Sequence, residues 1–164
     1  MLVSAERINQ NQCYHVTQVA DDTVEFITDS GVEYQINFMP DYTLWEEFAY
    51  QFVIINKNRK SSPNDAMLKD TLIYIVEDFF EENKNILLYI CETGDGKQAA
   101  RSKLFLRWFA NYHRSDDYFF NSTEIVGEEE SNFAAIILRK DNPNLEEIAN
   151  DFEEMTTFLG NKPD

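Results

Sequence analysis

The chain has 164 residues, and its 30 acidic and 14 basic side chains give a formal net charge of −16 at pH 7. This charge argues against nucleic acid as a partner, because neutralising phosphates requires clustered Lys and Arg. With 13 Phe and 8 Tyr the chain is too aromatic for intrinsic disorder, and its length fits a single domain over residues 1–164.

Two further observations bear on where the protein resides. The longest apolar runs, 86–91 and 133–138, are too short to cross a bilayer, and the opening sequence MLVSAERINQ lacks the apolar core of a secretory signal. The two cysteines, Cys13 and Cys91, offer no disulfide framework, and no pair of histidines has the spacing of metal ligands. We therefore expect a soluble cytoplasmic protein without a metal site or a membrane partner.

The first half of the chain is expected to be mainly β-structure. Residues 24–28 and 32–38 flank the turn sequence DSG and alternate apolar with polar side chains, which predicts a hairpin with one wet face. A strand over 13–19 is expected before this hairpin. The more apolar run 48–55 predicts a central strand, and the polar stretch 56–64 predicts a loop.

The second half alternates helices and strands. Apolar residues at helical spacing predict a helix over 65–82, and the run 86–91 predicts a buried strand. A helix ending near Tyr112, strands over 117–126 and 133–139, and a helix opened by DNPN complete the chain. The order predicts an α+β fold: a central mixed, mostly antiparallel sheet flanked by helices, with an extra C-terminal helix and with strands 48–55 and 86–91 adjacent at its centre.

Over residues 24–139 this order resembles the later part of the Gcn5-related N-acetyltransferase fold, in which a splayed central sheet carries a helix on each side. In that family, a Gln/Arg-x-x-Gly-x-Gly/Ala loop after the central strand binds the pyrophosphate of acyl-CoA. The resemblance would place cofactor contacts at Arg59, Lys60 and Ser62. However, Ser62 and Asn64 stand where glycines belong, and Phe105 stands near the position of a tyrosine that can act as general acid.

The stretch CETGDGKQAARSKLFLRWF, residues 91–109, looks more like a site than any other. Gly96-Lys97 fits a Walker phosphate loop, but Cys91 replaces its first glycine and Gln98 replaces its magnesium-binding hydroxyl. Asp95 and Gln98 instead fit a helix capping box, in which the Asp95 carboxylate would occupy the place of a phosphate. Capping is the preferred interpretation, and anion binding involving Lys97 is the alternative.

Arg101 is expected to project into the apolar face of the helix that follows, whereas Lys103 and Arg107 lie off that face. An arginine in such a place must be paired or must extend to water. Its partner would be a carboxylate of this chain, such as Asp95 or Glu92, or alternatively the carboxylate or phosphate of a ligand. The residues of the face are Leu104, Phe105, Trp108, Phe109 and Tyr112.

Cys91 precedes the expected helix start, where a thiolate would be stabilised. A Cys-His enzyme would need His15 or His113 beside it, and His113 lies at the far end of the helix. A buried structural cysteine is therefore preferred to a nucleophile, and no catalytic residue can be assigned.

The same stretch is similar to an uncharacterised family of small Bacteroidetes proteins, whose signature is Cys-Asp-x-x-Asp-Gly-x-Gln, then an arginine, then Leu-Phe-x-x-Trp-Phe. Glu92 departs from this signature, and the resemblance covers residues 65–112. It implies no activity. The matching residues are Cys91, Asp95, Gly96, Gln98, Arg101, Leu104, Phe105, Trp108 and Phe109.

Three functions fit these observations. The first is a non-catalytic module that binds a protein or a small ligand on an acyltransferase-like sheet, with no cofactor. The second is an acyl-CoA-dependent N-acyltransferase with a degenerate loop, for which acetyl-CoA would be the cofactor. The third is a purely structural or inhibitory acidic partner, which would require one continuous acidic face. The missing glycines and tyrosine favour the first over the second, and the basic loop Lys57, Arg59 and Lys60 keeps the second open.

Overall fold

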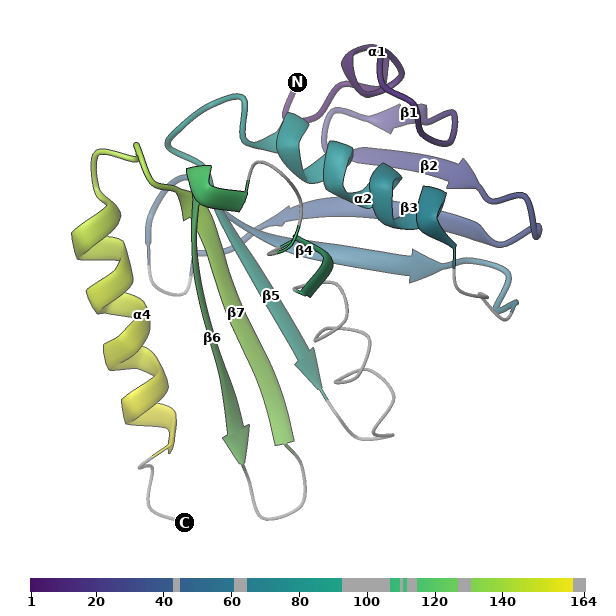
Figure 1. Ribbon diagram of the computed structural model, residues 1–164. Helices are drawn as coiled ribbons and strands as arrows, with labels where there is room; N and C mark the ends of the chain where they lie inside the picture. The colour runs from purple at the N-terminus through teal and green to yellow at the C-terminus, as the bar shows by residue number, and fades with distance from the viewer. Residues whose placement is uncertain are drawn as a thin grey trace. The chain divides into compact units, whose positions relative to one another are not determined.

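The computed structural model (Figure 1) describes residues 1–42, 45–60, 65–92, 107–109, 111, 115–126 and 131–160. The chain divides into two compact units, each made of two segments. Unit 1 comprises Met1–Met39 and Phe52–Glu82, and unit 2 comprises Pro40–Gln51 and Asn83–Asp164. The prediction of a single domain stays a prediction.

Unit 1 holds the predicted hairpin. Strands β2 and β3 pair antiparallel from Thr23↔Asn37 to Ile27↔Glu33, and Gly31 takes the left-handed φ of 84° in the turn between them. A short strand β1 pairs antiparallel with β2. The elements of this unit are α1 (Ala5–Ile8), β1 (Thr17–Ala20), β2 (Thr23–Ile27), β3 (Glu33–Pro40), α2 (Ala66–Phe79) and, from Phe52 on, β4 (Ala49–Asn56).

The first strand begins at Thr17, so the strand predicted over 13–19 is wrong before that residue. Backbone amides in this segment bond to side chains instead of a neighbouring strand. Tyr14 N donates to Thr71 Oγ1 at 2.9 Å, and Val16 N donates to Asn9 Oδ1 at 2.8 Å. The sequence analysis also missed α1, a single helical turn capped by Ser4.

Helix α2 lies over one face of this hairpin (Figure 1). Val32, Tyr34, Ile36 and Phe38 alternate along β3 and are all buried, as the sequence pattern predicts. The rings of Phe38 and Phe79 stack with centroids 4.5 Å apart. The apolar residues of α2 that were expected to form its inner face are buried as well: Leu68, Leu72, Ile75, Val76 and Phe79.

Unit 2 is built on three long strands. β5 pairs antiparallel with β7, and β7 pairs antiparallel with β6 over nine residue pairs. The first residues of β4, Ala49–Gln51, pair in parallel with Ile86–Leu88. The elements are β5 (Ile86–Glu92), a 3₁₀ turn (Ser115–Asp117), β6 (Tyr118–Val126), β7 (Ser131–Arg139) and α4 (Leu145–Gly160).

The strands follow one another in the hydrogen-bonded order β1-β2-β3-β4-β5-β7-β6. The prediction of an α+β fold with a mixed, mostly antiparallel sheet is confirmed. The predicted neighbours 48–55 and 86–91 are β4 and β5, the fourth and fifth strands of the seven, and they pair in parallel.

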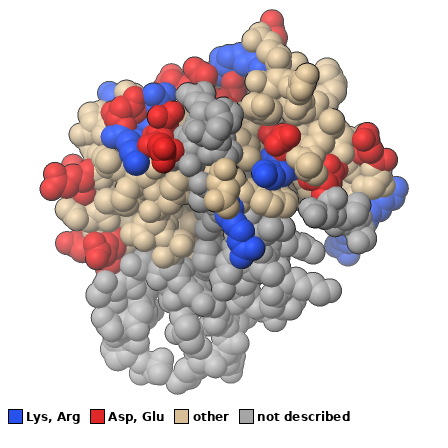
Figure 2. All heavy atoms as spheres, viewed as in Figure 1, with Lys and Arg blue, Asp and Glu red and all other residues tan. Residues whose placement is uncertain are grey.

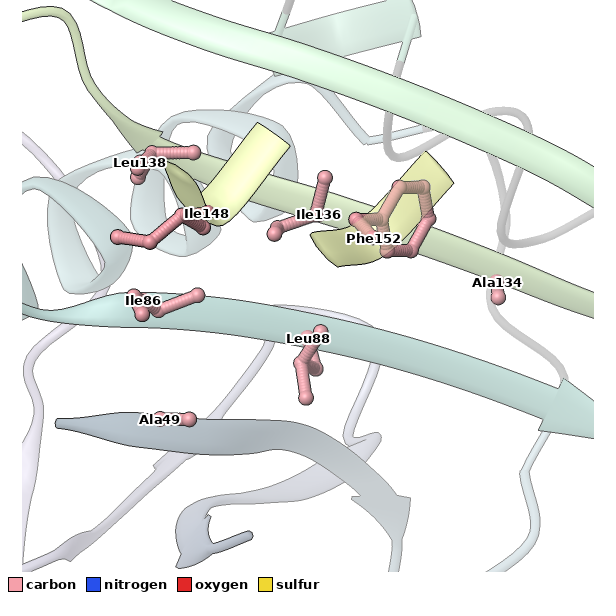
Figure 3. Close-up of a cluster of buried hydrophobic side chains, with 8 residues drawn as sticks. All are labelled: Ala49, Ile86, Leu88, Ala134, Ile136, Leu138, Ile148 and Phe152. Atoms are coloured by element: carbon pink, nitrogen blue, oxygen red, sulfur yellow. The ribbon is translucent and has the colours of Figure 1, made fainter. Parts of the chain in front are cut away.

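Helix α4 covers one face of the unit 2 strands. Ile148 and Phe152 point from α4 toward Ile136 and Leu138 of β7 and Ile86 of β5 (Figure 3). Both α4 side chains are at least 96% buried, so each contributes on the order of 2 kcal/mol through removal of apolar surface from water. The buried cluster consists of Ala49, Ile86, Leu88, Ala134, Ile136, Leu138, Ile148 and Phe152.

A second set of aromatic contacts in unit 2 involves the helical residues 107–109. Phe109 is fully buried and makes edge-to-face contacts with Tyr118 and Phe120 of β6. Arg107 is exposed, as expected for a residue off the apolar face. Across the described residues, the helices fall short of the length and apolarity that a membrane span requires.

Candidate functional site

The basic residues that the acyltransferase resemblance predicts as cofactor contacts lie in unit 1, in the loop between β4 and α2. Lys57, at the start of this loop, is engaged by the adjacent hairpin. Its Nζ lies 2.7 Å from Glu25 Oε1, and this hydrogen bond and charge raise the pKa of Lys57. Lys57 is therefore part of an internal ion pair rather than a ready contact for an anion.

Asn58 fixes the path of the loop against the β2–β3 turn. Its Nδ2 donates to Gly31 O at 2.8 Å, and its Oδ1 accepts from Glu33 N at 3.2 Å. The backbone adds a further bond, in which Lys57 N donates to Glu33 O at 2.7 Å. These three bonds hold the start of the loop in one conformation.

Arg59 and Lys60 follow this anchor, and both side chains are exposed. Arg59 has a φ of 55°, a left-handed conformation that costs a residue with a side chain about 1 kcal/mol. Within the described residues neither side chain forms a salt bridge, so both cations face solvent. Ser62, the third residue of the predicted contact set, lies outside the described residues.

The start of α2 carries the feature that bears most directly on anion binding. Asp65 is the N-cap of this helix, and its Oδ1 accepts from Met67 N at 2.9 Å and from Leu68 N at 3.1 Å. A bound pyrophosphate in the acyltransferase manner would need such amides. Here a carboxylate already occupies them and adds a negative charge at the same place.

Tyr14 holds the Asp65 carboxylate from the opposite side. Its hydroxyl donates to Asp65 Oδ2 and accepts from Asp29 N at 3.3 Å. Burial raises the pKa of Tyr14, and its hydrogen bond to Asp65 raises it further. The cap is thus part of a network that joins the loop before β1, the hairpin turn and α2.

Of the residues weighed for nucleophilic chemistry, the side chain of Cys91 and the whole of His113 lie outside the described residues. Burial raises the pKa of the Cys13 thiol, which opposes thiolate formation, and the Cys13 Sγ lies 3.7 Å from Ile8 O. His15 is exposed. Among the described side chains, we found no group of His, Cys, Asp and Glu that could hold a metal ion.

The second predicted site, residues 91–109, is described only at its ends. Cys91 is the penultimate residue of β5 and lies in register with Phe133, and Phe109 is buried as expected. Asp95, Lys97 and Arg101 lie outside the described residues, and so does Phe105. The capping box and the buried arginine pair therefore stay predictions.

Sequence reasoning missed the role of Asp65, although a signal was present, because an aspartate directly before an apolar helical pattern indicates an N-cap. Its contact with Tyr14 spans 51 residues and has no local signature. The same holds for Asp78, a buried carboxylate on α2 that accepts from Ser4 N and from Arg7 across more than 70 residues.

Comparison with curated proteins and with solved structures returned no match. The profile of a family of unknown function, DUF6169, matches residues 64–154, which is more than half of the chain. The match begins one residue before the Asp65 cap and ends within α4. The chain therefore belongs to the DUF6169 family of unknown function.

Proposed function

We propose that this protein is a cytoplasmic, non-catalytic binding module built on an acyltransferase-like scaffold. The scaffold is supported by the order of elements: antiparallel strands β1 to β3, then β4, helix α2 and the parallel strand β5, then the antiparallel strands β6 and β7. This order is the one on which the resemblance to the Gcn5-related fold rests.

The position of Asp65 speaks against catalysis by the acyltransferase mechanism. An acyltransferase of this kind holds the cofactor pyrophosphate on backbone amides at the start of the helix after the central strand. In this chain the Met67 and Leu68 amides donate to the Asp65 carboxylate, which is itself held by Tyr14. Binding a pyrophosphate there would require displacing the cap and bringing like charges together, both of which cost free energy.

The distribution of charge supports a binding module over a purely structural or inhibitory acidic partner, which would require one continuous acidic face. Figure 2 shows acidic side chains separated by neutral and basic ones on the face in view, among the residues it describes. A protein or a small ligand, rather than nucleic acid, fits a net charge of −16. The partner is proposed to be neutral or basic, because an acidic protein repels anionic surfaces.

One observation favours the second candidate, an acyl-CoA-dependent N-acyltransferase. Arg59 and Lys60 present two exposed cations within a few residues of α2, where a cofactor phosphate would arrive. Exposed cations of this kind support weak electrostatic attraction of CoA. They do not replace the amides that Asp65 occupies.

Calorimetric titration with acetyl-CoA and with CoA distinguishes the two functions. The binding module predicts no dissociation constant in the micromolar range or below and no turnover with common amines. The acyltransferase predicts micromolar binding that the double variant Arg59→Ala/Lys60→Ala abolishes. The matched control is Lys69→Ala/Lys140→Ala, which removes the same charge elsewhere. Micromolar binding lost only in the first pair would overturn the proposal.

A further inference from the structure

Strand β6 ends the sheet, and its outer edge has the features of a docking site for another strand. It is nine residues long and pairs with β7 through nine consecutive pairs, from Tyr118↔Arg139 to Val126↔Ser131. Among the described residues, no strand pairs with its other side. In an antiparallel pair every second residue directs its N–H and C=O away from the partner, so this edge presents a row of backbone donors and acceptors.

The strand at the other end of the order, β1, is protected against such pairing. It has four residues, and its register shifts between Gln18 and Ala20. The Gln18 side chain bonds to Val3 O and Ala5 N, which ties the N-terminal segment to this strand. A short length, a bulge and a covering segment are the devices by which proteins block edge pairing.

Among the described residues, β6 lacks the short length and the register shift that protect β1. Its sequence, YFFNSTEIV, contains no lysine and no proline, and its register with β7 runs without a shift. A long regular edge strand of this kind is either a hazard for aggregation or a surface that a partner covers. The net charge of −16 disfavours association with a second copy, which favours the second interpretation.

The acidic residues near β6 favour a positively charged partner. Asp116 and Asp117, just before the strand, are exposed, and Glu124 lies within it. From Ser115 to Leu138 the sequence contains no Lys or Arg, and the next cations along the chain are Arg139 of β7, opposite Tyr118, and Lys140, whose amide donates to Asp117 O. Antiparallel pairing of β6 with β6 of a second copy would bring Asp116 and Asp117 of each copy toward the end of the strand that holds Glu124 of the other, which is unfavourable. An extended segment carrying lysines or arginines would be attracted.

We propose that the outer edge of β6 binds a basic, extended peptide segment of another protein as an added strand. The backbone of the segment would supply the hydrogen bonds, and its cations would meet the acids beside β6. This inference rests on the proposed function as a binding module and names the surface and the class of partner.

The test uses a nine-residue peptide of alternating Lys and Val, equal in length to β6, added to the full chain. Hydrogen exchange followed by mass spectrometry should show slowed exchange of amides within residues 118–126. A second peptide replaces alternate valines with proline, which keeps the charge but removes the donors of the ladder. It should neither bind comparably nor protect β6.

Two variants and one matched control locate the contact. Ser122 is exposed on β6, and Ser122→Lys introduces a lysine, the side chain that commonly prevents another strand from pairing with a sheet edge. Asp116→Lys reverses the charge of an exposed residue just before the strand. Each should weaken binding about fivefold, as expected for repulsion between surface charges. Glu146→Lys makes the same charge reversal on α4, within the shallow acidic depression that Glu147 and Asp151 also line, and should leave affinity unchanged.

The inference would be overturned if the peptide left hydrogen exchange at β6 unchanged, or if the proline peptide bound equally well. It would also be overturned if Glu146→Lys lost affinity and Asp116→Lys did not. A dimer in sedimentation that Ser122→Lys dissociates would instead assign the edge of β6 to a second copy of this chain. Binding of the lysine peptide at another surface would leave the proposed binding module standing. Acetyl-CoA turnover would refute the module whatever happens at β6.

Discussion

Arg7 and Asp78 form a bidentate ion pair between α1 and α2 whose two members differ in burial. Arg7 Nε lies 2.7 Å from Asp78 Oδ1, and Arg7 Nη2 lies 3.2 Å from Oδ2. The Arg7 side chain is 49% exposed and the Asp78 side chain 5% exposed. Removing the exposed member therefore leaves a buried carboxylate without its main counter-ion, which is the costly way to break such a pair.

Arg7→Met should lower the free energy of unfolding by about 2 kcal/mol, measured by urea denaturation. The double variant Arg7→Met/Asp78→Asn should cost less than the sum of the single variants by about 1 kcal/mol, because the asparagine no longer buries a charge. Lys57→Met, which breaks the more exposed pair with Glu25, is the control and should cost less than Arg7→Met. Equal costs for Arg7→Met and Lys57→Met would contradict this account.

The cap of α2 can be tested through Asp65. Asp65→Ala removes the acceptor for the Met67 and Leu68 amides and should destabilise the protein by about 1 kcal/mol. Asp65→Asn keeps a capping oxygen but replaces the acceptor of the Tyr14 hydroxyl with an amide nitrogen, so it should cost less than Asp65→Ala without being neutral. The midpoints of urea denaturation give both values. If the alanine variant were as stable as the parent, the cap would not be what holds the start of α2.

The stability of the protein should depend on Tyr14 at high pH. Its pKa is raised from the ordinary value of 10.0 by burial and by the hydrogen bond to Asp65. A group whose folded pKa lies above its unfolded pKa contributes stability that is complete below the unfolded pKa and is lost as pH rises through the folded pKa. The parent should thus lose stability above pH 10, and Tyr14→Phe should lose less over the same interval.

The same variant has a cost at neutral pH. Tyr14→Phe leaves Asp65 Oδ2 and Asp29 N without this partner and should destabilise by about 1 kcal/mol. Tyr42→Phe, at a tyrosine that is 73% exposed, is the control and should change neither the value at pH 7 nor the slope above pH 10. Parallel pH curves for the parent and Tyr14→Phe would argue against the role of the Tyr14 hydroxyl.

The elements that sequence predicted well are those with a local periodic signal. The alternation of Val32, Tyr34, Ile36 and Phe38 located β3, because a strand with one buried face must alternate. The helical spacing that ends at Phe79 located α2 for the same kind of reason. The apolar character of 48–55 and 86–91 placed them at the centre of the sheet. Ile86 to Tyr89 of β5 are buried on both faces, whereas Val53 to Ile55 of β4 are partly or largely exposed.

What sequence could not supply are contacts between distant residues. The Tyr14 amide donates to the Thr71 side chain, 57 residues away in the sequence. This amide is therefore not available to pair with a neighbouring strand, as a strand over 13–19 would have required. The Tyr14 and Asp65 contact that shapes the candidate site is of the same kind. Asp95, Lys97 and Arg101 stay candidates on sequence grounds alone, because they lie outside the described residues.

The last prediction concerns the packing of α4 and the cooperativity of the chain. Phe152 is 1% exposed within the cluster of unit 2, and Phe152→Ala should cost about 3 to 4 kcal/mol through lost burial and the cavity it leaves. Glu154→Ala, at an exposed position on the same helix, should stay within about 0.5 kcal/mol of the parent. Trp45 packs against this cluster and its Nε1 donates to Asp151 Oδ2 at 3.0 Å, so its fluorescence reports on unit 2.

A Trp108→Phe background leaves Trp45 as the sole tryptophan for this measurement. If the chain is one domain, Arg7→Met in unit 1 and Phe152→Ala in unit 2 should both shift the urea transition that Trp45 reports, because a cooperative domain unfolds as a whole. Strand β4 contributes residues to both units, which gives a covalent reason to expect this coupling. A Trp45 transition moved by Phe152→Ala and left in place by Arg7→Met would instead mean that the two units unfold independently, and the expectation of a single domain over residues 1–164 would be wrong.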